Sequence, residues 1–338
     1  MAMKILHNVS LLPFNTFKMN VKAKECRIIE DENELLKIDT LSQNSLVLGG
    51  GSNVLFTKDY DGIILKNELK GREIIDESEE EILLNIKGGE NWHSVVMWAV
   101  ENNWNGIENL ALIPGTMGAA PIQNIGAYGV EIKDVLEYVR FYHFDTKSFE
   151  TIKNQDCQFA YRDSIFKRSL KNKVFITDVG LRLRKKNHQY KLDYGNIREE
   201  LDKRNIQTIR PKLIAEVVMH IRQTKLPDPN EVGNAGSFFK NPEVSEEVYW
   251  RLKEKFPNIV AYSMGNNKYK LAAGWMIEYC GFKGYVHKRA AVHTRQALVL
   301  INQKNATGKD ILELANIIID KVNQVFGVIL EPEVNIIG

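Results

Sequence analysis

The chain has 338 residues, with 45 basic and 43 acidic side chains and a formal net charge of +2. Hydrophobic residues make up 44% of it and charged residues 26%, which is typical of a globular protein and excludes a disordered or collagen-like chain. The length predicts two or three domains. The small net charge gives no long-range basic field, so we expect no nucleic-acid partner.

Membrane, secretion and metal signals are missing from the sequence. Apolar runs such as 95–100 fall far short of the roughly 20 residues that a membrane span needs, and the first residues lack the apolar core and cleavage site of a secretory signal. Cys26, Cys157, Cys280 and the seven histidines show no metal-ligand spacing. We therefore expect a cytoplasmic protein without a membrane contact or a metal site.

The first 69 residues predict a small α+β unit. Short strands are expected at 21–30, 45–48, 55–56 and 61–65. Asp31 and Glu34 have the spacing of a capping box and predict a helix start between the first two strands.

The middle of the chain predicts strands flanked by two helices. Two strands are expected within 73–88, and Asn91 caps a helix whose apolar residues recur at helical spacing. Residues 135–179 predict mostly strands, and 211–221 a helix.

Two prolines in 225–230 enforce extended backbone and mark a linker. Beyond it the pattern predicts a separate α/β unit. Its expected elements are a helix near 269–280, a strand at 297–301, an amphipathic helix at 309–326 and a last strand at 328–337.

Two glycine-rich loops are candidates for binding phosphate. Residues 49–54 follow a strand, but Val54 replaces the third glycine of the dinucleotide fingerprint and no helix pattern follows. The run still offers consecutive backbone N–H groups to an anion, although a tight turn between strands explains it as well. Residues 113–129 hold four glycines and three alanines, which suit either a bulky ligand or a close-packed turn. Together the loops favour an extended, phosphate-bearing cofactor.

Three further segments carry candidate polar groups. An extended 159–166 would place Arg162 and Ser164 on one side and Tyr161 and Asp163 on the other. Arg162 then either pairs with a carboxylate of the protein or holds a substrate carboxylate.

Near the linker, 233–242 collects the donors Asn234, Ser237, Lys240 and Asn241, which suit a polar ligand or an ordinary turn. In the last strand, period two places Glu331, Glu333 and Asn335 on one face, where solvated edge residues are an equal explanation. Tyr194 and Lys225 are ordinary surface residues on pattern alone.

Six segments resemble, in the same order, the UDP-N-acetylenolpyruvoylglucosamine reductase family, the MurB enzymes of peptidoglycan synthesis. They are 49–55, 113–115, 121–129, 161–166, 236–242 and 331–334. The segment around Tyr194 and the proline linker resemble the family's first type, which has a tyrosine loop over the substrate.

This resemblance implies an α+β fold on the FAD-linked oxidase (PCMH-type) scaffold. Two FAD-binding subdomains would span 1–69 and 70–226, the strand 328–338 would join the second, and a third, α/β domain at 227–327 would bind substrate. The implied cofactors are FAD and NADPH. The implied substrate is UDP-N-acetylglucosamine enolpyruvate, and the protein is expected to be a monomer.

The resemblance also implies residue roles. Arg162 and Glu333 would stabilise the enolate formed by hydride transfer, and Ser237 would protonate it. Substrate contacts would come from Tyr161, Tyr194, Lys225 and Asn241, with Lys225 also a candidate for the NADPH phosphates. FAD contacts would come from Gly49, Gly50, Gly51, Ser52, Asn53, Val54, Pro114, Gly115, Thr116, Gly118, Ala119, Gln123, Asn124, Ile125, Gly126 and Gly129.

Two other functions remain open from the sequence. One is an FAD oxidase on the same scaffold that returns electrons to O₂. The other is a nucleotide-sugar binding protein whose glycine loops hold phosphates without a flavin. A flavin absorbance band and the compound that restores it after reduction distinguish the three functions.

Overall fold

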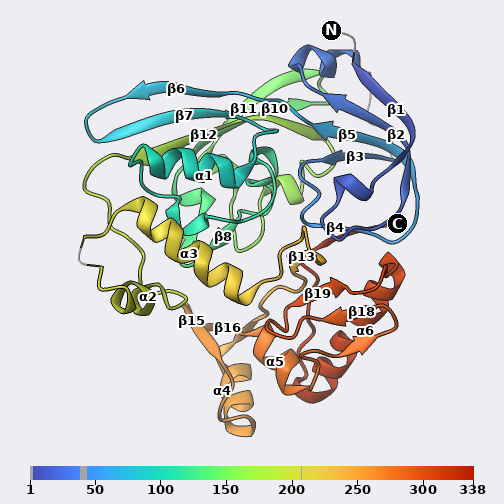
Figure 1. Ribbon diagram of the computed structural model, residues 1–338, viewed down its shortest axis with the longest axis vertical. Helices are drawn as coiled ribbons and strands as arrows, with labels where there is room; N and C mark the ends of the chain where they lie inside the picture. Colours follow the sequence, from blue (N-terminus) through green and yellow to red (C-terminus); the bar gives the residue numbers. More distant parts are fainter. Residues whose placement is uncertain (1–2, 39–43, 207) are drawn as a thin grey trace. The chain divides into compact units, whose positions relative to one another are not determined.

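The computed structural model describes residues 3–38, 44–206 and 208–338 (Figure 1). The chain forms two compact units, each built from three segments. Unit 1 comprises Met1–Val9, Ala23–Gly51 and Asp61–Thr224, and unit 2 comprises Ser10–Lys22, Ser52–Tyr60 and Lys225–Gly338. Within the described ranges, no helix has both the length and the apolar character that crossing a membrane requires.

Unit 1 contains two sheets. The first has the order β1-β2-β5-β3, with β3 parallel to β5, and its strands are β1 (Lys4–Ser10), β2 (Lys22–Ile29), β3 (Ser45–Leu48) and β5 (Tyr60–Asn67). The second is antiparallel, in the order β11-β10-β12-β7-β6. Its strands are β6 (Arg72–Glu77), β7 (Glu81–Lys87), β10 (Leu136–His143), β11 (Ser148–Lys153) and β12 (Val174–Arg184). The short strands β8 (Gly126–Ala127) and β9 (Val130–Glu131) pair with each other.

Two helices cover one face of the second sheet (Figure 1). They are α1 (Trp92–Glu101), capped by the Asn91 side chain, and α3 (Pro211–Lys225). Their apolar faces share one core with the inward side chains of β7, β10 and β12. β12 is buried along most of its length, as the central strand of a covered sheet should be. The remaining helix of unit 1, α2 (Ile197–Lys203), is short.

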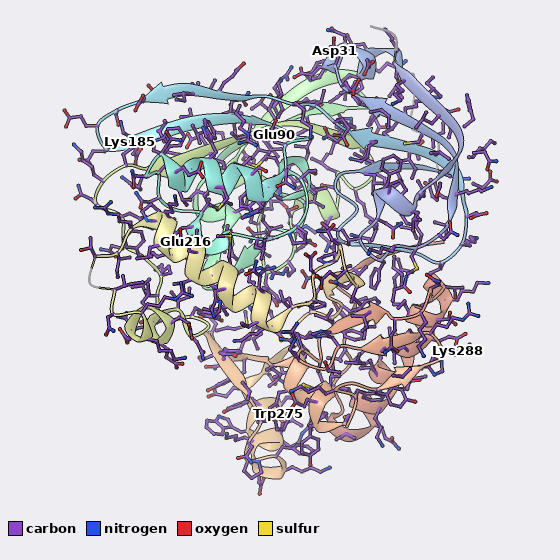
Figure 2. All side chains as sticks on the ribbon, in the orientation of Figure 1. Asp31, Glu90, Lys185, Glu216, Trp275 and Lys288 are labelled. Carbon is purple, nitrogen blue, oxygen red and sulfur yellow. The ribbon has the colours of Figure 1, made fainter. Side chains whose placement is uncertain are left out.

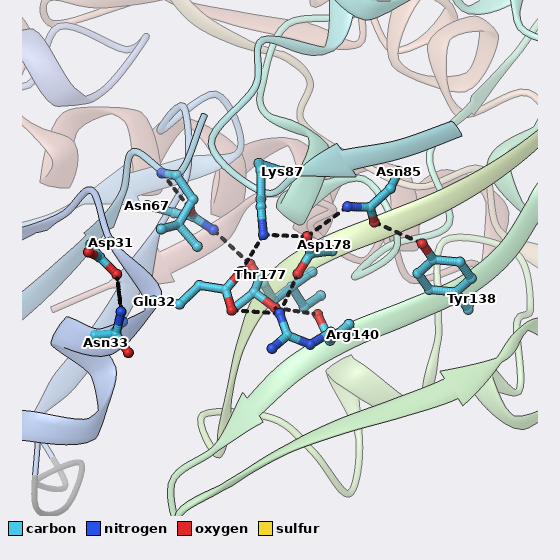
Figure 3. Close-up of polar contacts among 12 residues, drawn as sticks. Asp31, Glu32, Asn33, Asn67, Asn85, Lys87, Tyr138, Arg140, Thr177 and Asp178 are labelled. Atoms are coloured by element: carbon cyan, nitrogen blue, oxygen red, sulfur yellow. Dashed lines mark hydrogen bonds and ion pairs between the residues drawn. The ribbon is translucent and has the colours of Figure 1, made fainter. Parts of the chain in front are cut away.

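A partly buried charge network, centred on the buried Asp178, crosses unit 1 (Figure 3). The Asp178 carboxylate, on β12, lies 2.7 Å from Lys87 Nζ and 2.8 Å from Arg140 Nη1. Both cations also bind Glu32, which follows β2, with 2.6 Å between Arg140 Nη1 and Glu32 Oε2. Burial raises the pKa of Asp178, but hydrogen bonds from Lys87 and Arg140 outweigh it and hold the pKa below its usual value. The network therefore connects the second sheet to the segment between β2 and β3 of the first sheet.

Unit 2 is built on the amphipathic helix α6 (Gly308–Phe326), whose buried stripe runs from Ile311 to Phe326. Trp275, labelled on α5 in Figure 2, packs its ring 6.1 Å from that of Phe326. The other helices are α4 (Glu246–Lys255) and α5 (Ala273–Tyr279). The sheets are β13-β19-β18-β17, β14-β16-β15 and the parallel pair β20-β4. The strands are β4 (Val54–Phe56), β13 (Gly233–Ser237), β14 (Glu243–Ser245), β15 (Ala261–Gly265), β16 (Lys268–Leu271), β17 (Val286–His287), β18 (Ala290–Val292), β19 (Val299–Asn302) and β20 (Asn335–Ile337).

The expected last strand differs from the structure. Only Asn335–Ile337 is a strand, and Pro332 makes an isolated bridge to Phe239 instead, because proline lacks the N–H that a continuous ladder needs. This strand pairs with β4 in unit 2, whereas the sequence placed 328–338 with 70–226. The three-part division of the chain stays a prediction.

We expect Asp178→Ala to lower the free energy of unfolding by about 3 kcal/mol, because it leaves two partly buried cations with one carboxylate fewer. Urea denaturation measures this. The control Asp193→Ala breaks an exposed pair with Arg198 and should cost less than about 1 kcal/mol. Because the pKa of Asp178 is depressed in the folded protein, Asp178 contributes to the free energy of unfolding above about pH 4. This contribution is lost as the pH falls further. Equal losses in the two variants would contradict the prediction.

Candidate functional site

The two glycine-rich loops meet within unit 1. A Cβ on Gly49 would overlap the Thr116 hydroxyl oxygen, and one on Gly50 would lie 3.0 Å from Gly115 Cα. The Thr116 Oγ1 atom is buried and has no hydrogen-bond partner among the described residues. Glycine is thus required where β3 ends, because two backbones approach each other there. The buried Thr116 hydroxyl lies beside them and makes no hydrogen bond to the described residues.

The start of α1 supports the second loop. Trp92 N–H donates to Gly115 O at 3.1 Å, and Met117 N–H donates to Glu90 O at 2.8 Å. Glu90 is labelled beside α1 in Figure 2. The Trp92 indole also donates to Leu110 O at 3.0 Å. Gly118 serves packing, since its N–H donates to Gly88 O at 2.8 Å and a Cβ would press on that strand end.

Asn124 braces two segments of the candidate site. It is fully buried, and its amide nitrogen donates to Glu131 Oε2 at 3.0 Å and to Ala160 O at 3.1 Å. Ser164 Oγ makes a second connection, donating to Ile122 O at 2.6 Å. The segment 121–131 is therefore fixed against 160–164, and the Asn124 side chain is occupied inside the protein.

The segment 159–166 is not extended throughout, so the two-sided arrangement that an extended backbone would give does not occur. Arg162 has φ +53° in the left-handed region, and Ala160 and Asp163 exchange backbone hydrogen bonds in a tight turn. Asp163 pairs with Arg168 at 2.7 Å. The turn aims Arg162 back at the second loop, where its Nη2 donates to Gly126 O at 2.8 Å.

The sequence analysis missed Arg222, near the end of α3. Its Nε is buried without a hydrogen-bond partner among the described residues. Burial lowers the pKa of Arg222; the Tyr128 phenol opposes this, and the positive charge of Arg162 lowers it further. Two guanidinium groups close enough to repel suit an anionic ligand. One sequence feature could have drawn attention to Arg222: it precedes Lys225 by three residues, which places both cations on one face of the predicted helix.

Tyr194 lies beside the second loop. A Cβ on Gly129 would lie 3.4 Å from the Tyr194 ring, and one on Gly195 would overlap the Tyr128 ring. The Tyr194 side chain is half exposed. Tyr161 lies with its ring 5.4 Å from the Arg162 guanidinium carbon. The two expected tyrosines thus lie on the segments that meet around residues 126–129.

In unit 2, backbone hydrogen bonds bring the segment that follows Ser237 next to the segment that contains Glu333. Glu333 N–H donates to Phe238 O at 2.7 Å, and Lys240 N–H donates to Glu331 O at 2.9 Å. Asn53 supports this pairing, because its amide nitrogen donates to Glu333 O at 3.2 Å. Ser237, Glu333 and Asn53, from three distant parts of the sequence, therefore lie close together.

The other donors of 233–242 serve the fold. Asn234 is buried and shapes the turn before Ser237 by accepting from Gly236 N–H at 2.9 Å. Lys240 pairs with the exposed Glu331 at 3.2 Å, and Asn241 Oδ1 accepts from Ala273 N–H at 3.0 Å where α5 begins. The sequence pattern could not tell which of Glu331 and Glu333 lies in the site. In the structure Glu331 is an exposed ion-pair partner of Lys240, and Glu333 is half-buried near Ser237. Lys225 is exposed at the end of α3.

Comparisons with known proteins identify the families that the chain matches. Residues 31–148 match an FAD binding domain family, and 228–337 match the C-terminal domain of UDP-N-acetylenolpyruvoylglucosamine reductase. A reductase of that name from Flavobacterium johnsoniae is 43% identical over 99% of this chain and 100% of its own length. One from Photorhabdus laumondii is 49% identical over 98% of this chain and 96% of its own.

Solved structures agree on the fold. The structure of the reductase from Thermus caldophilus matches with a TM-score of 0.67 at 21% identity, covering 100% of both chains. The expected α+β fold on an FAD-linked oxidase scaffold is confirmed, and FAD is the cofactor that the matched domain binds. The chain belongs to the UDP-N-acetylenolpyruvoylglucosamine reductase family.

Proposed function

We propose that the protein reduces UDP-N-acetylglucosamine enolpyruvate to UDP-N-acetylmuramate with NADPH, a step of peptidoglycan synthesis. The observation that carries the proposal is the backbone pairing of 238–240 with 331–333, which brings Ser237 and Glu333 onto adjoining segments. FAD, when bound, relays a hydride from NADPH to the terminal methylene carbon of the enolpyruvyl group.

The residues of the glycine loops fit FAD. The side-chain-free surface of Gly49 and Gly50 admits a phosphate-bearing chain close to the backbone, and the unpartnered Thr116 hydroxyl supplies a hydrogen bond beside it. Gly51, Ser52 and Asn53 continue this run of backbone N–H groups. Among the other proposed contacts, Asn124 acts through the backbone that it holds, since its side chain is occupied.

Arg162 and Ser237 have complementary tasks. Hydride addition to the methylene carbon leaves negative charge that spreads onto the substrate carboxylate, and a preplaced guanidinium stabilises this charge as it grows. Ser237 then donates its proton to the neighbouring carbon, because an enolate carbon is basic enough to take a proton from a well-placed hydroxyl. Glu333 orients the proton donor or, when protonated, donates to the carboxylate.

Substrate binding is assigned to four further side chains. Tyr161 and Tyr194 offer rings and hydroxyl groups beside residues 126–129. Lys225 supplies a mobile positive charge for a diphosphate, and Asn241 supplies an amide.

An anaerobic absorbance experiment tests the function. Purified protein should show a flavin band that bleaches on addition of NADPH and returns on addition of the enolpyruvyl ether. A bleached band restored only by oxygen would favour the oxidase, and a protein that takes up no FAD but binds UDP would favour the nucleotide-sugar binding protein.

We expect Thr116→Val to weaken FAD binding roughly threefold to tenfold, the value of one neutral hydrogen bond. The stability of the FAD-free protein should stay equal or rise, because the substitution removes a buried, unpartnered hydroxyl. Quenching of flavin fluorescence measures binding, and thermal unfolding measures stability.

Thr177→Val is the matched control for this substitution. It removes a fully buried hydroxyl that donates to Arg140 O at 3.2 Å, so it should lower stability and leave FAD affinity unchanged. If Thr116→Val leaves FAD affinity unaltered, the proposed contact is wrong.

We expect Ser237→Ala to leave reduction by NADPH intact and to slow reoxidation by the enolpyruvyl ether at least a hundredfold, since only the second half-reaction needs its proton. Stopped-flow absorbance at the flavin band separates the two steps. Ser245→Ala, which removes the cap of α4, is the control and should change neither rate. If Ser237→Ala slowed both half-reactions equally, Ser237 would not be the proton donor.

A further inference from the structure

His93 lies in the first turn of α1 and reaches the loop that leads to Thr116. Its Nδ1 accepts a hydrogen bond from the backbone N–H of Leu112 at 3.1 Å. Leu112 has φ +59°, a left-handed conformation that costs free energy in a residue with a Cβ. A conformation of this kind persists only where its surroundings impose it, and the imidazole is one of the groups that do so.

The hydrogen bond requires a neutral imidazole. A ring nitrogen accepts only when it carries no proton, so Nδ1 must be bare and the proton must be on Nε2. Burial lowers the pKa of His93, and the positive charge of Arg222 lowers it further. Arg222 itself faces Tyr128 and Arg162. The surroundings thus favour the protonation state that the contact needs.

The helix that carries His93, α1, is held firmly in place. Five apolar residues of α1, namely Trp92, Val95, Val96, Ala99 and Val100, are buried in the core of unit 1, so the helix cannot follow a displaced loop. Trp92 holds the loop at Leu110 and Gly115, and His93 holds it between these points at Leu112. Three contacts from two consecutive residues therefore define the path of 110–115.

We propose that His93 is a positioning residue for the flavin: it holds Leu112 in the left-handed conformation that presents Gly115 and Thr116 to the cofactor. The inference rests on the proposed contact between FAD and this loop. His93 acts through the backbone of the loop and takes no part in hydride or proton transfer.

Two substitutions distinguish the effect of the hydrogen bond on FAD release from the effect of side-chain shape. In His93→Asn, the oxygen of the introduced side-chain amide would occupy the place of the imidazole Nδ1 and accept from the same N–H, whereas His93→Leu fills space and accepts nothing. The measurements on each full-length holoprotein are the rate of FAD release, followed by flavin fluorescence, and hydrogen exchange of the Leu112 amide.

His93→Leu should release FAD roughly tenfold faster and expose the Leu112 amide to exchange, and His93→Asn should restore both to within about threefold of the original protein. In the original protein, FAD release should accelerate as the pH falls through the lowered pKa of His93, on the acid side of the ordinary histidine value of about 6.5, because protonated His93 cannot accept. The His93→Asn protein should lack that part of the pH dependence.

Three results would overturn the proposal. They are an unchanged FAD release rate in His93→Leu, an equal acceleration in both variants, and faster Leu112 exchange without faster FAD release. None of these measurements uses the enolpyruvyl ether, so a failure of the proposed reductase activity would appear separately, as a holoprotein that binds FAD normally and is not reoxidised by the ether.

Discussion

The carboxylate of Asp178 organises the part of unit 1 on which the second glycine-rich loop, 113–129, rests. It binds Lys87 and Arg140 at 2.7 and 2.8 Å, next to the point where the second sheet meets the loop. Directly after Lys87, Gly88 N–H donates to Thr177 O at 2.7 Å, and Gly88 O accepts from Gly118 N–H at 2.8 Å. A short run of hydrogen bonds thus connects the charge network to residues 116–118. Removing one member of such a network leaves buried charge uncompensated, so the network also constrains the geometry of the loop.

Strained backbone marks the rest of the candidate site in unit 1. Leu112, Asn124, Tyr128 and Arg162 all have positive φ, between +45° and +59°. Each of these conformations is unfavourable for a residue with a side chain, and their concentration in two adjoining segments is typical of sites where geometry is held for function. In unit 2, backbone hydrogen bonds between 238–240 and 331–333 set the segment of Ser237 beside that of Glu333, and the positive φ of +69° just before Ser237 falls on a glycine, Gly236.

The sequence predicted those features that depend on local patterns. The capping box at Asp31, the Asn91 cap and the amphipathic helix near 309–326 are confirmed, because caps and apolar periodicity act within one element. The sequence left the backbone of 159–166 open, because the turn at Arg162 goes with tertiary contacts to 121–131 that a local pattern cannot predict. Arg222 and His93 carried no motif, since their importance comes from charges and a backbone amide that lie far away in sequence.

The pairing of β4 with β20 has a consequence for synthesis of the chain. Thr57 N–H donates to Ile337 O at 2.8 Å, across 280 residues. At roughly 5–20 residues per second, a ribosome needs about 15 to 60 s to make the intervening chain. During that time β4, with three buried residues Val54, Leu55 and Phe56, has no partner strand in unit 2. An unpaired apolar strand can pair with other chains, so slow translation of 225–338 would lengthen the period in which the nascent protein can aggregate.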